Sequence, residues 1–274
     1  MQPLQIGVCS WSLKIADLDQ TLSTIKNELG LKLVQLGFFD DSYKNTDQIM
    51  EAVKASGLEV STTCIGFEGE DYSSIPAIAK TGGYIPDDDW DNRLAKTLAV
   101  ADLTAKLGVK LLAAHIGFVP HDSSDPKYAI MVDRIKRICD ELGQRGLILI
   151  METGQEKAKD LIEFIDAVSC DNIAINFDSA NMILYGIGEP LEAIDILKDK
   201  IIHVHMKDAT WSDKPGQQWG EEVVLGTGQS DIPGIVNKLK RYGYTGPLVI
   251  EREVGDTPTR LADIKQAIKL LRSL

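Results

Sequence analysis

Eight short apolar runs, separated by longer amphipathic segments, are the feature that most constrains the fold of this chain. Short apolar runs of this kind indicate strands, and the amphipathic segments between them indicate helices. The helix-like segments 91–108 and 125–146 open on Asp and end at or beside a glycine, as helices commonly do. The expected strands cover residues 4–10, 33–39, 58–66, 109–117, 147–153, 173–179, 201–207 and 247–253.

Eight strand–helix pairs in 274 residues predict an α/β fold of the (β/α)₈ TIM barrel type, whose usual length is about 250 residues. A doubly wound open sheet is the alternative architecture. No low-complexity linker divides the chain, so residues 1–274 are expected to form a single domain. The two longest irregular regions, 67–89 and 209–230, both follow strands. In a barrel they would be loops over the C-terminal face, where function resides.

Charge and composition restrict the partners of the protein. The formal net charge of −12 repels phosphate backbones, so no nucleic acid partner is expected. The four cysteines lie far apart without a CxxC pair, which favours a reducing cytoplasm, and no signal peptide is evident. No apolar stretch approaches the roughly 20 residues of a membrane span, so no membrane association is expected. Whether the chain forms a homo-oligomer is left open.

The last four expected strands each deliver a potential ligand at or near the carboxyl end. Because side chains alternate along a strand, each of these residues shares its side with the inward-facing positions before it. His203 precedes His205 by two residues and lies on the same side, which indicates either a buried polar network or a site at the strand end. The four residues are Glu152, Asp178, His205 and Glu251.

Three carboxylates and one imidazole that converge on one point would repel one another without a cation. Oxygen ligands with one nitrogen suit one divalent metal ion such as Mn²⁺, Co²⁺, Mg²⁺ or Zn²⁺. Taken singly, a strand-terminal glutamate is more often a solvated end or an ion-pair partner, and a strand histidine more often a core residue. Four such residues on consecutive strands favour a metal site.

The order "IMET", "NFDSAN", "HVHMKD" and "GPLVIERE" resembles the xylose isomerase-like superfamily of sugar isomerases and epimerases. The resemblance extends from "IGVCSWS" through "HIGF" to "LGTGQSDIPGIVNKLKRYGYTGPLVIE". It implies that Glu152, Asp178, His205 and Glu251 bind one divalent metal ion, with Glu152 and Glu251 as catalytic acid and base. His203, one layer deeper, is then expected to support the site or the core.

The resemblance implies a metal-dependent sugar isomerase or epimerase that acts on a small-molecule keto-sugar through an enediolate. Loss of a β-hydroxyl from the same enediolate would instead make the enzyme a dehydratase of the inosose dehydratase type. An endonuclease IV-like phosphodiesterase and a non-catalytic sugar-binding barrel are less favoured. The first would need more histidine ligands than the four histidines of this chain supply, and the acid–base pair argues against the second.

Five further residues are expected to contact the substrate. His115 ends the fourth strand, and Lys207 follows His205 on the same face; packing and a solvated loop lysine are their respective alternatives. Trp11 and Phe38 are expected to wall the pocket with apolar rings, or else to lie in the core. Asn181 stands where many ketose 3-epimerases carry a substrate-binding histidine.

That histidine is not the only departure from the ketose 3-epimerase pattern. Trp211 stands where an arginine often follows the histidine motif. Together with Asn181, it argues against a simple ketohexose as the substrate.

Overall fold

The computed structural model describes residues 4–274 and arranges eight parallel strands in a closed barrel. Strand neighbours follow the chain order from β1 to β7, and β10 closes the ring between β7 and β1. The predicted (β/α)₈ barrel is therefore confirmed, and the open sheet is wrong. Each predicted strand contains one barrel strand: β1 (Ile6–Cys9), β2 (Leu33–Phe38), β3 (Glu59–Ile65), β4 (Leu111–Ala114), β5 (Ile148–Glu152), β6 (Ile173–Asp178), β7 (Ile201–Met206) and β10 (Leu248–Ile250).

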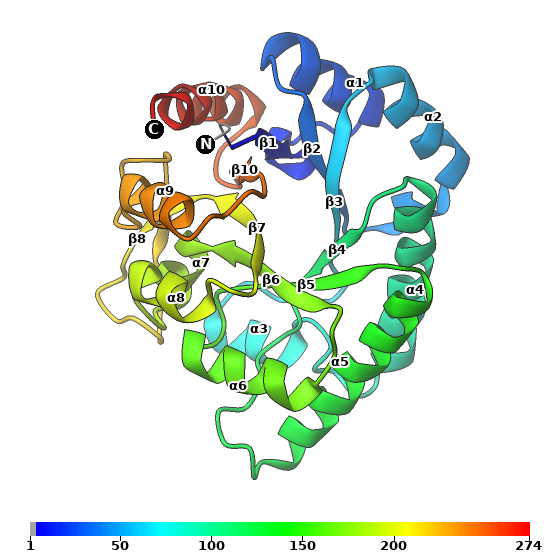
Figure 1. The fold of residues 1–274 in the computed structure, drawn as a ribbon, viewed down its shortest axis with the longest axis vertical. Coiled ribbons are helices and arrows are strands. Elements are labelled where there is room, and N and C mark those ends of the chain that lie inside the picture. Colours follow the sequence, from blue (N-terminus) through cyan, green and yellow to red (C-terminus); the bar gives the residue numbers. More distant parts are fainter. Residues whose placement is uncertain (1–3) are drawn as a thin grey trace.

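Helices surround the strands on all sides (Figure 1). Asp125 caps the N-terminus of α5 by accepting a hydrogen bond from the N–H of Lys127. Gly108 and Gly146 follow the ends of α4 and α5 with positive φ, as the sequence predicts for helix stops. The helices are α1 (Leu18–Ser23), α2 (Thr46–Ser56), α3 (Ile75–Thr81), α4 (Trp90–Lys106), α5 (Pro126–Gln144), α6 (Ala158–Val168), α7 (Ser179–Tyr185), α8 (Pro190–Leu197), α9 (Ile232–Arg241) and α10 (Thr257–Ser273). Shorter helical turns are η1 (Ser10–Leu13), η2 (Thr24–Glu28) and η3 (Asp41–Lys44).

The main hydrophobic core lies between the strands and the helices. Inside the barrel a smaller apolar cluster around Cys64, Ala113 and Ile150 is accompanied by fully buried polar side chains, among them Gln35 and Asn176. Buried polar groups need hydrogen-bond partners. The interior of the barrel is therefore built to hold a polar network.

Both long loops contain more regular structure than the sequence predicts. The loop after β3 includes α3, and the loop after β7 folds into an antiparallel pair, β8 (Asp208–Thr210) and β9 (Glu221–Val223). The carboxylate of Asp208 accepts hydrogen bonds from the N–H groups of Gly226, Gly228 and Ser230, which fixes the base of this hairpin. The expectation that both loops are wholly irregular is therefore wrong. Pairing between distant residues, as in the β8–β9 hairpin, leaves little local signal in the sequence.

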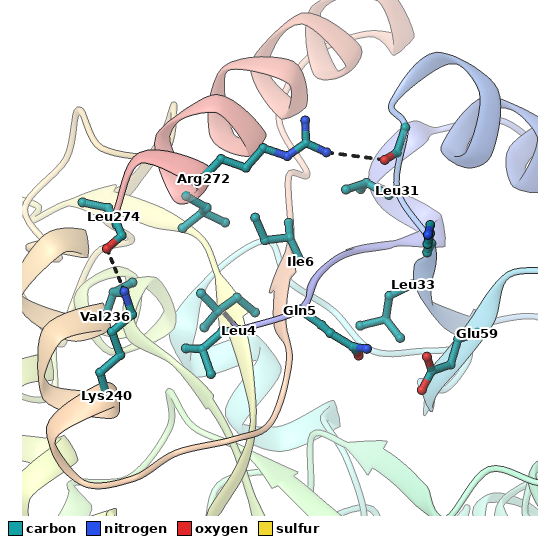
Figure 2. Close-up of a pocket in the computed structure, with 14 residues that line it drawn as sticks. Leu4, Gln5, Ile6, Leu31, Leu33, Glu59, Val236, Lys240, Arg272 and Leu274 are labelled. Atoms are coloured by element: carbon teal, nitrogen blue, oxygen red, sulfur yellow. Dashed lines mark hydrogen bonds between the residues drawn. The ribbon is translucent and has the colours of Figure 1, made fainter. Parts of the chain in front are cut away.

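A pocket of about 450 Å³ opens at the amino-terminal ends of β1, β2, β3 and β10, opposite the carboxyl ends that carry the candidate site (Figure 2). Its walls are mainly aliphatic. Two of its cations already bind backbone oxygens, since Lys240 donates to Leu274 and Arg272 donates to Gly30. This end of a barrel serves stability rather than catalysis.

Within residues 4–274, no helix is both long enough and apolar enough to cross a membrane.

Candidate metal and acid–base site

The carboxyl ends of β5, β6, β7 and β10 bring the four predicted ligands together. Each contributes one ligand atom, and these atoms lie within 4.8 Å of one another. Parallel strands of a barrel end at one rim, so residues far apart in the sequence meet there. All four side chains are buried: Glu152, Asp178, His205 and Glu251.

His205 is oriented by partners on both ring nitrogens. Its Nε2 lies 2.6 Å from Oε1 of Gln35, an atom that only accepts hydrogen bonds, so Nε2 carries the proton. Its Nδ1 lies 2.8 Å from Oε1 of Glu152, 3.4 Å from Oε2 of Glu251 and 3.8 Å from Oδ2 of Asp178. Burial lowers the pKa of His205, but the surrounding acidic groups outweigh it and raise that pKa well above its usual value. Without a cation, Nδ1 therefore also carries a proton that faces the carboxylates, and a bound metal ion would take the place of that proton.

Asp178 leaves one oxygen for a ligand. Its Oδ1 accepts a hydrogen bond from the N–H of Asn181 at the start of α7. Its Oδ2 is buried and has no hydrogen-bond partner among the described residues. An unpaired buried carboxylate oxygen is costly, and a cation would satisfy it.

The two glutamates each have a second oxygen held by a donor. For Glu152 this is Oε2, 3.0 Å from His115 Nε2; for Glu251 it is Oε1, which accepts a 2.8 Å hydrogen bond from Trp11 Nε1. Burial raises the pKa of Glu152, but the charges of His115 and His205 outweigh it and hold that pKa well below its usual value.

Burial raises the pKa of both Glu251 and Asp178, but the net pKa shifts of the two groups have opposite directions. For Glu251, Lys207 and His205 outweigh burial and lower its pKa to about 2. For Asp178, burial dominates and raises its pKa to about 6. Three acidic oxygens and one imidazole nitrogen form the donor set that divalent ions such as Mg²⁺, Mn²⁺, Co²⁺ or Zn²⁺ accept. The residues present therefore fit one cation.

His203 belongs to the polar network beneath the cluster. Its Nδ1 lies 2.8 Å from Oδ1 of Asn176, and the amide nitrogen of Asn176 lies 3.2 Å from Nε2 of His205. The two histidines of β7 therefore have separate positions, His205 in the cluster and His203 one layer below. Burial, followed by the charge of His205, lowers the pKa of His203 well below its usual value, which keeps this imidazole neutral.

A pocket of about 600 Å³ opens above the cluster, and Glu152 and Glu251 form part of its floor. The structure brings four of the five expected substrate contacts into its wall: Trp11, His115, Asn181 and Lys207.

Lys207 is not a solvated loop residue. It is buried, with Nζ 3.0 Å from Oε2 of Glu251 and 2.5 Å from Oε2 of Glu253. Burial lowers its pKa, but both carboxylates outweigh this effect and raise it well above the ordinary value. The nearby amide of Asn181 donates to Glu152 at 3.2 Å. Lys207 therefore stays charged and holds Glu251 in place.

The structure places Phe38 outside the pocket. Gln35 points into the barrel, so alternation along β2 turns Phe38 outward into the core between strands and helices. The next residue, Phe39, lines the pocket and meets Trp11 edge-on at 5.2 Å. A Cβ at Gly37 would lie 2.5 Å from both rings, so only glycine leaves room for this packing.

Several residues of the site and its pocket are absent from the sequence prediction. Gln35 has a usable signal, a polar residue at an inward position of an otherwise apolar strand. Phe39 could have been found from the alternation of side chains along β2, which places it on the inward-facing side. Tyr72, Tyr185 and Trp219 come from loops or a short helix, and only their position after barrel strands points to the pocket.

The fold and the site define a class of closed (β/α)₈ barrels that carry a buried carboxylate–histidine cluster, a candidate metal site, at the carboxyl ends of their strands. Within that class the chain belongs to the family of xylose isomerase-like TIM barrels, whose family model matches residues 26–274. The resemblance seen in the sequence is thereby confirmed. A solved structure similar to this chain is a xylose isomerase domain protein from Planctomyces limnophilus, with 34% identity, 99% of this chain and 96% of that chain covered, and a TM-score of 0.90.

More distant similarities show the fold. The 3-keto-D-glucoside 4-epimerase YcjR from E. coli superposes with a TM-score of 0.72 at 16% identity, covering 99% of this chain and 100% of that chain. A xylose isomerase-like barrel from Mycobacterium smegmatis in complex with magnesium gives a TM-score of 0.72 at 16% identity, covering 100% and 99%.

The chain also matches a curated relative, the uncharacterized protein YihM of Escherichia coli (strain K12). The two are 23% identical over 167 residues, which is 58% of this chain. The match spans about half of the relative's length, 51%.

Proposed function

We propose that this protein is a divalent-metal-dependent isomerase or epimerase of a small keto-sugar, with Glu152 and Glu251 as acid and base. The observation that carries the proposal is the pair of buried glutamates on β5 and β10. Each has one oxygen in the ligand cluster and the other held by a fixed donor. Groups fixed in this way can exchange protons with a substrate held between them.

A single cation would be held by Glu152, Asp178, His205 and Glu251, the set supported by the unpaired Oδ2 of Asp178 and the orientation of His205. When bound, it would supply positive charge beside the two oxygens of an enediolate. The oxygen-rich donor set favours Mg²⁺ or Mn²⁺, with Co²⁺ and Zn²⁺ as alternatives. The magnesium complex of the barrel from Mycobacterium smegmatis supports this choice.

The proton transfers follow from the charges around the glutamates. Both carboxylates are held ionised, Glu152 by His115 and His205 and Glu251 by Lys207 and His205, so either can accept the proton of the carbon next to a carbonyl. For epimerisation, the other glutamate first takes a proton from water and delivers it to the opposite face of the same carbon, which inverts its configuration. For isomerisation, the abstracted proton is delivered to the former carbonyl carbon while a hydroxyl proton moves to the other oxygen, which relocates the carbonyl group. His115 and Asn181 would orient the hydroxyl groups. The epimerase activity named for YcjR is the kind of reaction expected here.

Metal content tests the ligand set without any substrate. Protein purified without chelator should contain up to one Mg, Mn, Co or Zn per chain by elemental analysis. His205→Ala should lose that metal while its circular dichroism spectrum stays unchanged. His121→Ala is the matched control, because His121 is exposed and pairs with Asp160 on the surface. Full metal occupancy in His205→Ala would remove His205 from the site.

Deuterium exchange tests the acid–base pair. Incubation of the metal-loaded protein with a panel of ketoses in D₂O should place deuterium on the carbon next to the carbonyl of the substrate. Glu251→Gln should lose about 10² to 10⁴ of the exchange rate, whereas Glu163→Gln, on the exposed side of α6, should not. Turnover without deuterium, or a Glu251→Gln rate near wild type, refutes the assignment. Loss of a hydroxyl from the product would identify a dehydratase instead.

A further inference from the structure

The upper wall of the pocket differs in character from its floor. The floor carries the ligand cluster, whereas much of the wall above it is aromatic. Its rings come from three separate segments: Tyr72 from the loop after β3, Tyr185 from α7, and Trp219 from the hairpin loop between β8 and β9. Aromatic rings present flat apolar faces that suit the C–H face of a sugar ring.

The rings of this aromatic wall pack against one another and against neighbouring side chains. Tyr185 and Trp219 lie edge to face with centroids 4.6 Å apart, and Phe118 packs against the other side of Tyr185 at 5.6 Å. Ile75 and Ile78 of α3 support the same cluster from the side. A wall fixed in this way loses little entropy when a ligand packs against it.

Trp219 has an unused donor. Its indole Nε1 is buried and has no hydrogen-bond partner among residues 4–274. Buried Trp N–H groups usually find an acceptor. This atom is also closed to the pocket, so Trp219 would contact a ligand through its ring and not through this N–H.

Most donor groups of Lys207 and Arg260, two cations of the pocket, already bind protein oxygens. Lys207 lies between Glu251 and Glu253, and Arg260 donates through Nε to Gly255 O and through Nη1 to Trp11 O. The wall also contains the carboxylate of Glu70, which accepts from the N–H groups of Phe67 and Gly83. A phosphate group needs converging free donors of positive charge, and this arrangement disfavours it.

The pocket also exceeds the size of one sugar ring. A volume of about 600 Å³ corresponds to about 20 water-sized units at roughly 30 Å³ each. A single hexose has about a dozen non-hydrogen atoms, fewer than that number of water-sized units, so one ring at the cluster leaves part of the pocket lined by Trp219 and Tyr185 unfilled.

We propose that the substrate is an uncharged, ring-substituted keto-sugar: its ketose unit reaches Glu152 and Glu251, and a second sugar ring or similar ring packs against Trp219 and Tyr185. This inference rests on the proposed function, since it assumes that the ketose end lies at the cluster. It excludes sugar phosphates as the preferred class.

Three commercially available ketoses with one skeleton provide the test: D-fructose, D-fructose 6-phosphate, and isomaltulose, which carries a glucosyl ring on the same oxygen. Isothermal titration of the metal-loaded protein should show isomaltulose binding about tenfold more tightly than D-fructose, because aromatic stacking contributes on that order. D-Fructose 6-phosphate should bind most weakly. Isomaltulose that binds no more tightly than D-fructose, or a preference for the phosphate, overturns the proposal.

Variants of the hairpin separate ring contact from loop stability. Trp219→Leu should lose the tenfold advantage of isomaltulose over D-fructose, whereas Trp219→Phe should keep most of it. Trp211→Leu is the control, because Trp211 lies on the same hairpin segment but packs against Ala180 and Ile183 rather than the pocket. An equal loss in Trp211→Leu overturns the proposal. Failure of the proposed function would appear separately, in the metal content and the deuterium exchange.

Discussion

Replacement of Gln35 by leucine tests whether the orientation of His205 prepares the cluster for a cation. Gln35 is fully buried on β2, and its Oε1 accepts a 2.6 Å hydrogen bond from Nε2 of His205. Leucine has a similar size but offers no acceptor. The imidazole would then be free to rotate, so that Nδ1 would no longer be held toward Glu152 and Asp178.

The expected loss is in metal affinity. Removal of the outer partner of a ligating histidine typically weakens metal binding 10- to 100-fold, which is about 1.4 to 2.7 kcal/mol. The short hydrogen bond and the complete burial of Gln35 place the expected value in the upper half of that range. Folding stability should change less, because the amide nitrogen of Gln35 is itself buried without a partner among the described residues.

Titration of the metal-free protein with Mn²⁺ in a calorimeter measures the effect. Gln35→Glu keeps an acceptor and should bind Mn²⁺ at least as tightly as the wild type. Thr104→Val is the matched control, because it removes buried hydrogen bonds to Val100 O and Thr63 on the helix side of the strands. Gln35→Leu with wild-type Mn²⁺ affinity would refute the reasoning, and equal weakening in Thr104→Val would assign the effect to general destabilisation.

Three further outcomes are expected. Burial raises the pKa of Glu156 to about 8, against the hydrogen bond from Val119 N–H. The folded state therefore keeps a proton that the unfolded chain releases, and stability falls as pH rises from about 5 to about 8. Urea unfolding should show Glu156→Gln gaining stability relative to the wild type over that range. A difference in unfolding free energy that stays constant with pH contradicts this. Phe164→Ala should cost about 3 to 5 kcal/mol in the same assay, because this fully buried ring of α6 packs on Tyr128. Because of the net charge of −12, the metal-loaded protein should not cleave a duplex with an abasic site; efficient nicking on a gel would favour a phosphodiesterase.

The barrel and the ligand cluster could be predicted from the sequence for one physical reason. Strand periodicity is local, and it determines which side of each strand a residue occupies. Glu152, Asp178 and His205 each follow inward positions on their strands. Once the strands are parallel neighbours in a barrel, their carboxyl ends necessarily share a rim, so the convergence of the ligands needs no further information.

The pocket above the cluster depends on contacts that no local pattern encodes. Phe38 and Phe39 are adjacent and both aromatic, and only the inward position of Gln35 and the space above Gly37 decide which of them enters the pocket. Trp219 reaches the pocket only because β8 and β9 pair into a hairpin whose base is fixed by Asp208.

The sequence by itself therefore determined the strands, the faces of those strands and the residues at their ends, since these follow from a repeat of two along the chain. The tertiary structure decided how the loops fold over the barrel and which ring enters the pocket. These features arise from hydrogen bonds and packing between distant segments, such as Tyr185 against Trp219, whose energies appear only once the chain has folded.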